Sequence, residues 1–201
     1  MTISRYDWAK WYNENATESE RLLADRVLRF ENLFSDMLFW DDADNGENWL
    51  KTYSLLPAHI TCFSIRFVHF STIPPAGYDA FYKHDELTLF VKPECILKDY
   101  IVLHEMTHLH ESIINDLPPM FHESILWRLY TDLKKQVGRL DEIISNHTNL
   151  SKELAIAEIG GVHDLLFLLK SFDLDIRAGY SLGTVFGYGK TDEYSRYTYN
   201  K

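Results

Sequence analysis

Two histidines separated by three residues are the feature of this sequence with the clearest chemical potential. The stretch at 104–108 reads HEMTH and lies in a run rich in Leu, Met and Ile. If this run is helical, residues four apart lie one above the other, so His104 and His108 can bind the same metal ion. Glu105 borders that face, where a carboxylate can take a proton from water. The pattern therefore predicts a Zn2+ site with two histidine ligands and Glu105 as the catalytic general base.

The residues around this stretch predict an amphipathic helix. At 100° per residue, the two histidines and Glu105 share one side with Glu111 and Ser112, and apolar residues occupy the other side. We expect the apolar side to pack in a core and the other side to be mostly polar. Glu111 or Ser112 could then orient a ligand histidine, as metal-bound imidazoles usually require. The alternative is an ordinary amphipathic helix with solvated His and Glu side chains.

Zinc catalysis normally needs a third protein ligand, which must come from elsewhere in the chain. Pro118-Pro119 predicts the end of the first helix and the start of a second one, because Pro is disfavoured inside a helix but suits its first turn. His122 points in the direction of the apolar stripe of that second helix, so we prefer it as the third metal ligand. Glu123 is the alternative third ligand, and more distant carboxylates such as Glu153 and Glu158 stay open.

These motifs resemble the zincin superfamily of metallopeptidases, first in its SprT-like version. That resemblance implies His104, His108 and His122 as zinc ligands and Glu105 as the catalytic residue. It covers roughly residues 70–137, and HExxH is its specific part. The matching segments are Ala76-Gly77-Tyr78, a strand at 86–91, the helix start Leu103–His108, and His122 followed by Leu126-Trp127.

The second version is the gluzincin pattern, in which a helix of the type Pro-x-Trp-Phe-x-Glu-Gly-Leu-Ala supplies a glutamate ligand. The stretch 118–126, PPMFHESIL, is similar to it and implies Glu123 in place of His122. These two residues follow His108 by 15 and 14 positions, so the spacing alone does not choose between them. The metzincin pattern is excluded, because Glu111 and Ile114 occupy the positions of its glycine and its third histidine.

The whole chain, 1–201, predicts a single α+β domain with a zincin-like fold: a small mixed sheet, an edge strand over the HExxH active-site helix, and further packing helices. The core would span about 58–137, with a strand at 58–70 and either a pair of strands or one bent strand at 78–91. Residues 86–91 would form the edge strand, on which an extended peptide can lie.

Helices and a tail are expected on either side of this core. The spacing of apolar residues predicts an N-terminal helix at 18–40 that packs behind the sheet. The C-terminal part, 139–175, reads as helical, including a helix at 151–172. His163 and Asp164 in this helix are expected to belong to a buried polar cluster, with a catalytic pair as the alternative. A Gly- and Tyr-rich tail follows at 178–201.

Charge and composition restrict the partners. Asp and Glu outnumber Lys and Arg by 30 to 20, and the net charge is −10. Nucleic acid is therefore an unexpected partner, since a duplex-binding protein presents a basic face to phosphate. No membrane span and no signal peptide are visible, which predicts a cytoplasmic protein without a membrane partner.

We expect a zinc-dependent metallopeptidase, a hydrolase that acts on a peptide or protein substrate through metal-activated water. The alternative from another functional class is a zinc-binding scaffold without proteolytic activity, which would act as a regulatory or binding module. Glu105 favours the enzyme, because a degenerate site would often have lost this residue.

Overall fold

The computed structural model describes residues 14–30, 33–34, 68–115, 119–147, 163–189 and 194–200. The chain divides into an N-terminal unit, Met1–Ile113, and a C-terminal unit, Ile114–Lys201, and each is described by itself. The single domain stays a prediction. Several predictions lie partly or wholly outside the described residues. They are the end of the first helix at 35–40, most of the strand at 58–70, the helix start at 151–162, the candidate ligands Glu153 and Glu158, and residues 190–193 and 201 of the tail.

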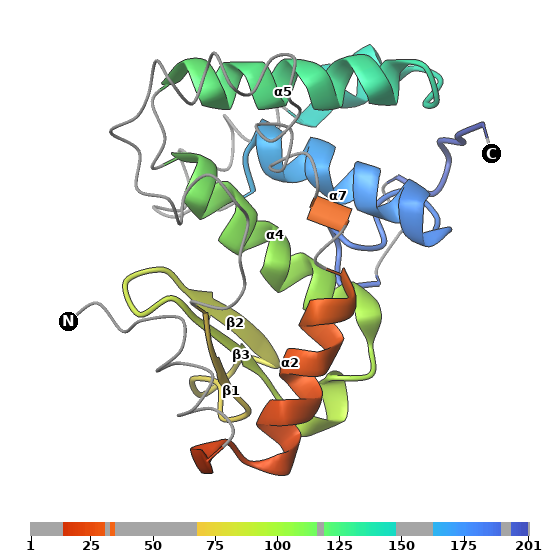
Figure 1. Ribbon diagram of the computed structural model, residues 1–201. Helices are drawn as coiled ribbons and strands as arrows, with labels where there is room; N and C mark the ends of the chain where they lie inside the picture. The colour runs from red at the N-terminus through yellow and green to blue at the C-terminus, as the bar shows by residue number, and fades with distance from the viewer. Residues whose placement is uncertain are drawn as a thin grey trace. The chain divides into compact units, whose positions relative to one another are not determined.

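The N-terminal unit contains a three-stranded mixed sheet, which confirms the α+β class (Figure 1). Its strands are β1 (His69–Ser71), β2 (Ala80–Lys83) and β3 (Thr88–Val91). β3 pairs with β1 in parallel and with β2 in antiparallel orientation. The prediction of a strand pair within 78–91 is therefore confirmed, with a turn at 84–87 between the two strands.

The prediction that residues 86–91 form the edge strand is wrong for the described sheet. The strand order is β1-β3-β2, so β3 lies in the middle and β2 lies at an edge. Leu89 and Val91 of β3 are fully buried, as expected for a central strand. The sequence did not reveal this order, because the parallel pairing of β3 with β1 involves only three residues of each strand.

The α-helices α2 and α4 accompany the sheet in the described part of the N-terminal unit (Figure 1). Helix α2 (Glu18–Phe30) begins at a capping box, in which Thr17 and Glu20 exchange hydrogen bonds between side chain and backbone. Helix α4 (Asp99–Asn115) carries the HExxH stretch. The Arg26 Nε of α2 donates to Asp99 Oδ1 over 2.7 Å, which ties α2 to the first turn of α4. A carboxylate is favoured there because the N-terminus of a helix is partly positive.

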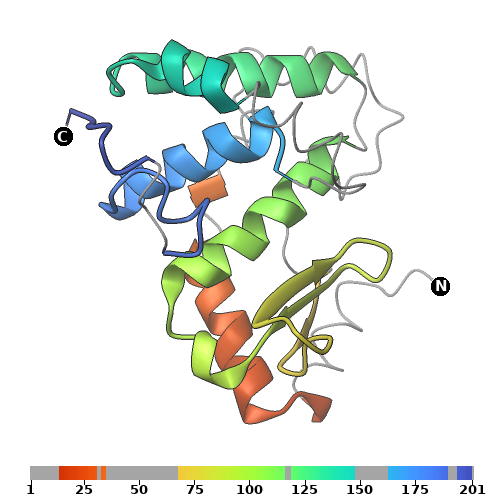
Figure 2. The same cartoon turned by 180° about the vertical axis from the view of Figure 1, so that it is seen from behind.

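The C-terminal unit is built on α5 (Pro119–Lys134), a helix at 140–147, and α7 (Leu165–Ala178), with α5 packed on α7 (Figure 2). The boundary at Pro118-Pro119 agrees with the prediction. The predicted helix at 151–172 is wrong at 163–164, because α7 starts only at Leu165. Asp164 is its N-cap: the backbone there is extended, and the carboxylate accepts a hydrogen bond from the Phe167 N–H at 2.9 Å.

The described part of the Gly- and Tyr-rich tail is packed into the C-terminal unit. Tyr194 and Tyr197 are buried. The Tyr199 hydroxyl donates to the Tyr180 carbonyl over 2.8 Å, and the Tyr197 hydroxyl donates to Glu142. These contacts give the residues of the tail a structural role within this unit.

Gly183 is expected to be indispensable to this packing. Its φ of +87° is unfavourable for other residues, and a Cβ there would lie 2.8 Å from the Tyr194 ring. Gly183→Ala should therefore lower the free energy of unfolding by about 3 kcal/mol, from backbone strain and overpacking together. Urea unfolding would measure this loss. The matched control is Gly179→Ala, where φ is +77° and nothing lies near the Cβ. Equal losses for the two variants would contradict the contact with Tyr194.

Asp175 of α7 gives the C-terminal unit a predictable pH dependence. Its buried carboxylate accepts hydrogen bonds from the backbone N–H groups of Gly183 (2.7 Å) and Val185 (2.9 Å). Burial nevertheless raises the pKa of Asp175 from 3.8 to about 7. Between these two values the carboxyl group is ionised in the unfolded chain but protonated in the folded chain. The contribution of Asp175 to stability is thus complete below pH 3.8 and is lost as the pH rises to 7.

An NMR titration of the Asp175 carboxyl carbon would test this expectation directly. We expect a midpoint near 7, and the stability of the wild type relative to Asp175→Asn should fall between pH 4 and 7. A midpoint near the ordinary aspartate value of 3.8 would contradict it.

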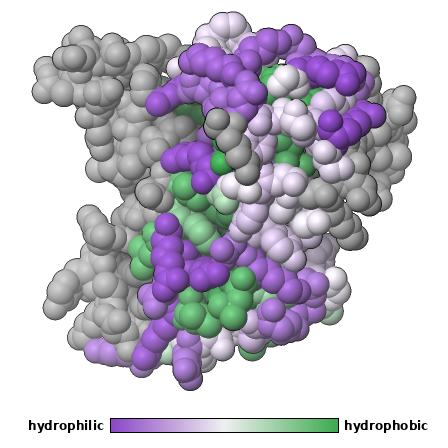
Figure 3. Space-filling model, turned by 90° about the vertical axis from the view of Figure 1, so that its right-hand side faces the viewer, coloured by the Kyte–Doolittle hydropathy of each residue, from purple (hydrophilic) through white to green (hydrophobic). Residues whose placement is uncertain are grey.

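The surface of the described residues carries many charged side chains. On the face shown in Figure 3, hydrophilic residues surround smaller apolar areas. Among the described residues, no helix has the length and apolar character that crossing a membrane requires.

Candidate metal centre

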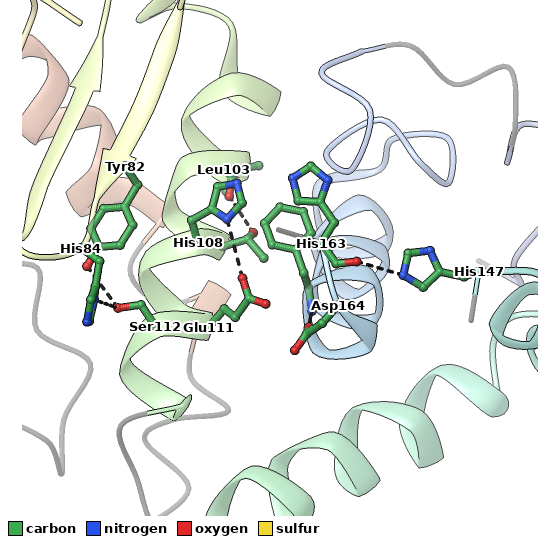
Figure 4. Close-up of polar contacts among 11 residues, drawn as sticks. Tyr82, His84, Leu103, His108, Glu111, Ser112, His147, His163 and Asp164 are labelled. Carbon is green, nitrogen blue, oxygen red and sulfur yellow. Dashed lines mark hydrogen bonds and ion pairs between the residues drawn. The ribbon is translucent and has the colours of Figure 1, made fainter. Parts of the chain in front are cut away.

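Helix α4 holds His104 and His108 side by side (Figure 4 labels His108). Their ring centroids are 4.9 Å apart and the ring planes make an angle of 75°. The arrangement follows from the helical period, which stacks residues four apart on one face. The structure therefore brings together the two histidines that the sequence predicted as metal ligands.

The face of α4 that carries these histidines is more buried than the sequence suggested. His104 and Glu105 are each only 1% exposed, and Glu111 is 8% exposed. The alternative of solvated His and Glu side chains is therefore wrong for His104, Glu105 and Glu111. Imidazoles and carboxylates are side chains that metal cations bind.

Glu111 lies beside one of the two histidines. Its Oε2 is 3.6 Å from His108 Nδ1, one helical turn further along α4 (Figure 4). This distance exceeds that of a hydrogen bond, but it allows electrostatic attraction between the carboxylate and the ring N–H. A carboxylate at Nδ1 favours the tautomer whose Nε2 can bind a metal. Of the two candidates for orienting a ligand histidine, the structure thus places Glu111 at His108, and Ser112 contacts other residues.

His110, the third histidine of this stretch, is fully buried on another side of α4. Its ring lies 5.6 Å from that of Phe34, centroid to centroid. This placement makes His110 a packed residue of the N-terminal unit.

His122 and Glu123 lie in the first turn of α5, in the C-terminal unit. His122 is half-buried and Glu123 is exposed. Glu123 borders an open, largely apolar groove of about 320 Å³ within this unit. The choice between these two residues as third ligand stays a prediction. The groove is lined by Glu123, Leu126, Trp127, Tyr130, Ile144, Leu165 and Leu169.

His163 immediately precedes the N-cap of α7. Its ring stacks on that of Phe167 with centroids 4.3 Å apart, and its carbonyl oxygen lies 3.1 Å from His147 Nε2 (Figure 4). Burial, and then the neighbouring His147, lower the pKa of His163 to about 4, so its imidazole is neutral at pH 7. A neutral imidazole is the form that binds metals.

Because His163 and Asp164 were expected inside a helix, His163 was not predicted as a metal ligand. Gly160-Gly161 and Asp164 were available signals, because Gly interrupts helices and Asp favours the N-cap position. Together they mark a helix start after residue 164 and leave His163 just outside it.

Comparison with known proteins gave no match to a protein-family model, a curated protein or a solved structure. The resemblance to SprT-like and gluzincin-like proteins therefore stays a prediction.

Proposed function

We propose that this protein is a zinc-dependent metallopeptidase. The observation that carries the proposal is the pair of imidazoles on α4, 4.9 Å apart, with the buried carboxylate of Glu105 next to them in the chain. Imidazole nitrogens are preferred zinc ligands, and a catalytic zinc keeps one position open for water.

We propose His163 as the third ligand, ahead of His122 and Glu123. The chemistry of His163 supports this choice, because its imidazole is neutral at pH 7 and a neutral imidazole is the form that binds metals.

The bound zinc, Glu105 and Glu111 each have a defined role in this proposal. Bound zinc would lower the pKa of its water towards ~7 and polarise the substrate carbonyl. Glu105 takes a proton from the water that attacks the peptide carbonyl and delivers it to the leaving amine. Glu111 holds the His108 ring through Nδ1. The net charge of −10 favours neutral or basic peptides as substrates.

One observation favours the second candidate, a zinc-binding scaffold without proteolytic activity. Glu105 is only 1% exposed, whereas a general base must reach a water molecule and a substrate. Activity measurements distinguish the two functions. A metallopeptidase loses hydrolysis when zinc is chelated and regains it when zinc is restored, whereas a scaffold binds zinc without hydrolysing any peptide.

Zinc affinity tests the choice of the third ligand. We expect His163→Ala to weaken zinc binding by at least about 100-fold, because the loss of even an outer partner of a ligand costs 10- to 100-fold. His122→Ala and Glu123→Ala serve as matched controls and should stay within a few-fold of the wild type. A loss confined to His122→Ala or Glu123→Ala would assign the ligand to that residue instead.

A further inference from the structure

Three side chains that can each carry a proton form a chain beside the HExxH helix. His84 Nδ1 lies 2.6 Å from the Ser112 hydroxyl oxygen, and that oxygen lies 3.2 Å from the Tyr82 hydroxyl (Figure 4). Tyr82 belongs to β2, at an edge of the described sheet, and its side chain is buried. His84 directly follows β2 and is exposed. The hydrogen-bonded row of Tyr82, Ser112 and His84 therefore runs from the interior of the N-terminal unit to an exposed imidazole.

Ser112 places His84 in line with the two proposed zinc ligands on α4. Ser112 follows His108 by four residues and His104 by eight, so Ser112 and the two histidines occupy one stripe of the helix. Four residues correspond to about 6 Å along a helix axis. Through its contact with Ser112, His84 thus lies next to the stripe of α4 that carries the ligands, about one turn beyond His108.

We assign the proton of the His84 ring from the two hydroxyl groups beside it. Ser112 has a single O–H and contacts both Tyr82 and His84. The phenol is the more acidic hydroxyl, so we assign its proton to the bond towards Ser112. The Ser112 proton then points to His84 Nδ1, and the His84 proton lies on Nε2. In this arrangement the exposed imidazole presents an N–H donor in a fixed orientation.

The surroundings of His84 disfavour a negatively charged ligand. Asp85 and Glu86 follow it, and both are exposed carboxylates. Glu86 pairs with Lys83, whereas Asp85 adds negative charge immediately beside the imidazole. A neutral oxygen acceptor, such as a main-chain carbonyl, fits this position better than a carboxylate or phosphate.

We propose that His84 is a substrate-binding residue that donates its Nε2–H to a main-chain carbonyl of the peptide. The proposal rests on the metallopeptidase function proposed above. An extended peptide advances about 3.3 Å per residue, so an offset of about 6 Å places this carbonyl about two residues from the scissile bond. Tyr82 and Ser112 are positioning residues, since they fix the orientation and the proton of His84.

This position predicts which kinetic constant depends on His84. A hydrogen bond made away from the scissile bond is equally strong in the bound substrate and in the transition state, so its loss raises KM and leaves kcat unchanged. We expect His84→Ala to raise KM by about 10-fold, the effect of one hydrogen bond. Ser112→Ala should act in the same direction but less strongly. His84→Gln should restore part of the loss, because its amide nitrogen can occupy the position of Nε2.

The test uses the wild-type chain and an octapeptide library with products identified by mass spectrometry. The best substrate is then shortened by one residue at a time from each end. The wild type should lose affinity when the peptide becomes too short to reach His84, and His84→Ala should not distinguish the long peptide from the short one. His69→Ala is the matched histidine control from β1 and should behave like the wild type. Zinc content should be equal in all these proteins.

Two results overturn the proposal while the metallopeptidase function stands: an unchanged KM in His84→Ala, or an equal loss for long and short peptides. If the wild type cleaves no peptide, the proposed function fails, and binding decides the role of His84. NMR of the Glu105→Gln protein would then follow the His84 ring during addition of the pooled octapeptides. A shift of its resonances supports peptide binding at His84, and the absence of a shift overturns it.

Discussion

Glu105→Gln should reduce kcat for peptide hydrolysis by at least about 100-fold and leave zinc bound. General acid–base catalysis contributes 10²- to 10⁴-fold, and glutamine cannot take up the proton that this role requires. The side chain keeps nearly the same shape, which matters because Glu105 is only 1% exposed. The measurement is kcat on a peptide substrate together with the zinc content of the same preparation.

The matched control is Glu94→Gln, an exposed glutamate of the short helix η3 (Pro93–Cys95) in the same unit. It should leave kcat and zinc content unchanged. Full activity of Glu105→Gln would rule out the assigned role of this residue. Zinc binding without hydrolysis in the wild type would instead favour the scaffold function.

The second large effect is expected from His104→Ala and His108→Ala, which should abolish the stabilisation of the protein by zinc. At a free zinc concentration of about 100 times Kd, the wild type gains about 2.7 kcal/mol. For a chain of 201 residues this corresponds to a Tm increase of roughly 5–10 °C. Calorimetry with and without zinc would measure the shift.

The control for these two variants is His69→Ala, which removes a histidine of β1 from the same unit. It should keep the full zinc-dependent shift of the wild type. A shift that persists in His104→Ala and His108→Ala would place the zinc at a different site.

Local signals predicted the boundary between two helices and the pairing of two histidines. Pro118-Pro119 marked the boundary between α4 and α5, because proline ends one helix and suits the first turn of the next. The HExxH spacing predicted the pairing of His104 with His108, since four residues make about one helical turn.

Features that depend on distant residues were not predictable in the same way. The central position of β3 depends on its parallel partner β1, and no periodicity encodes that pairing. The burial of His104 and Glu105 was missed because helical periodicity separates polar from apolar residues and does not reveal what else packs on the polar side. His163 was not predicted as a ligand because the expected helix at 151–172 included it. In the structure His163 lies just before α7.

The zinc content of the purified wild-type protein tests the central claim most directly. Elemental analysis of a dialysed preparation, with the protein concentration determined in parallel, gives the stoichiometry. We predict one zinc ion per chain in the wild type and none in His104→Ala. A folded wild-type protein that contains no zinc, and takes up none when zinc is added, would contradict the metal site and the function proposed from it.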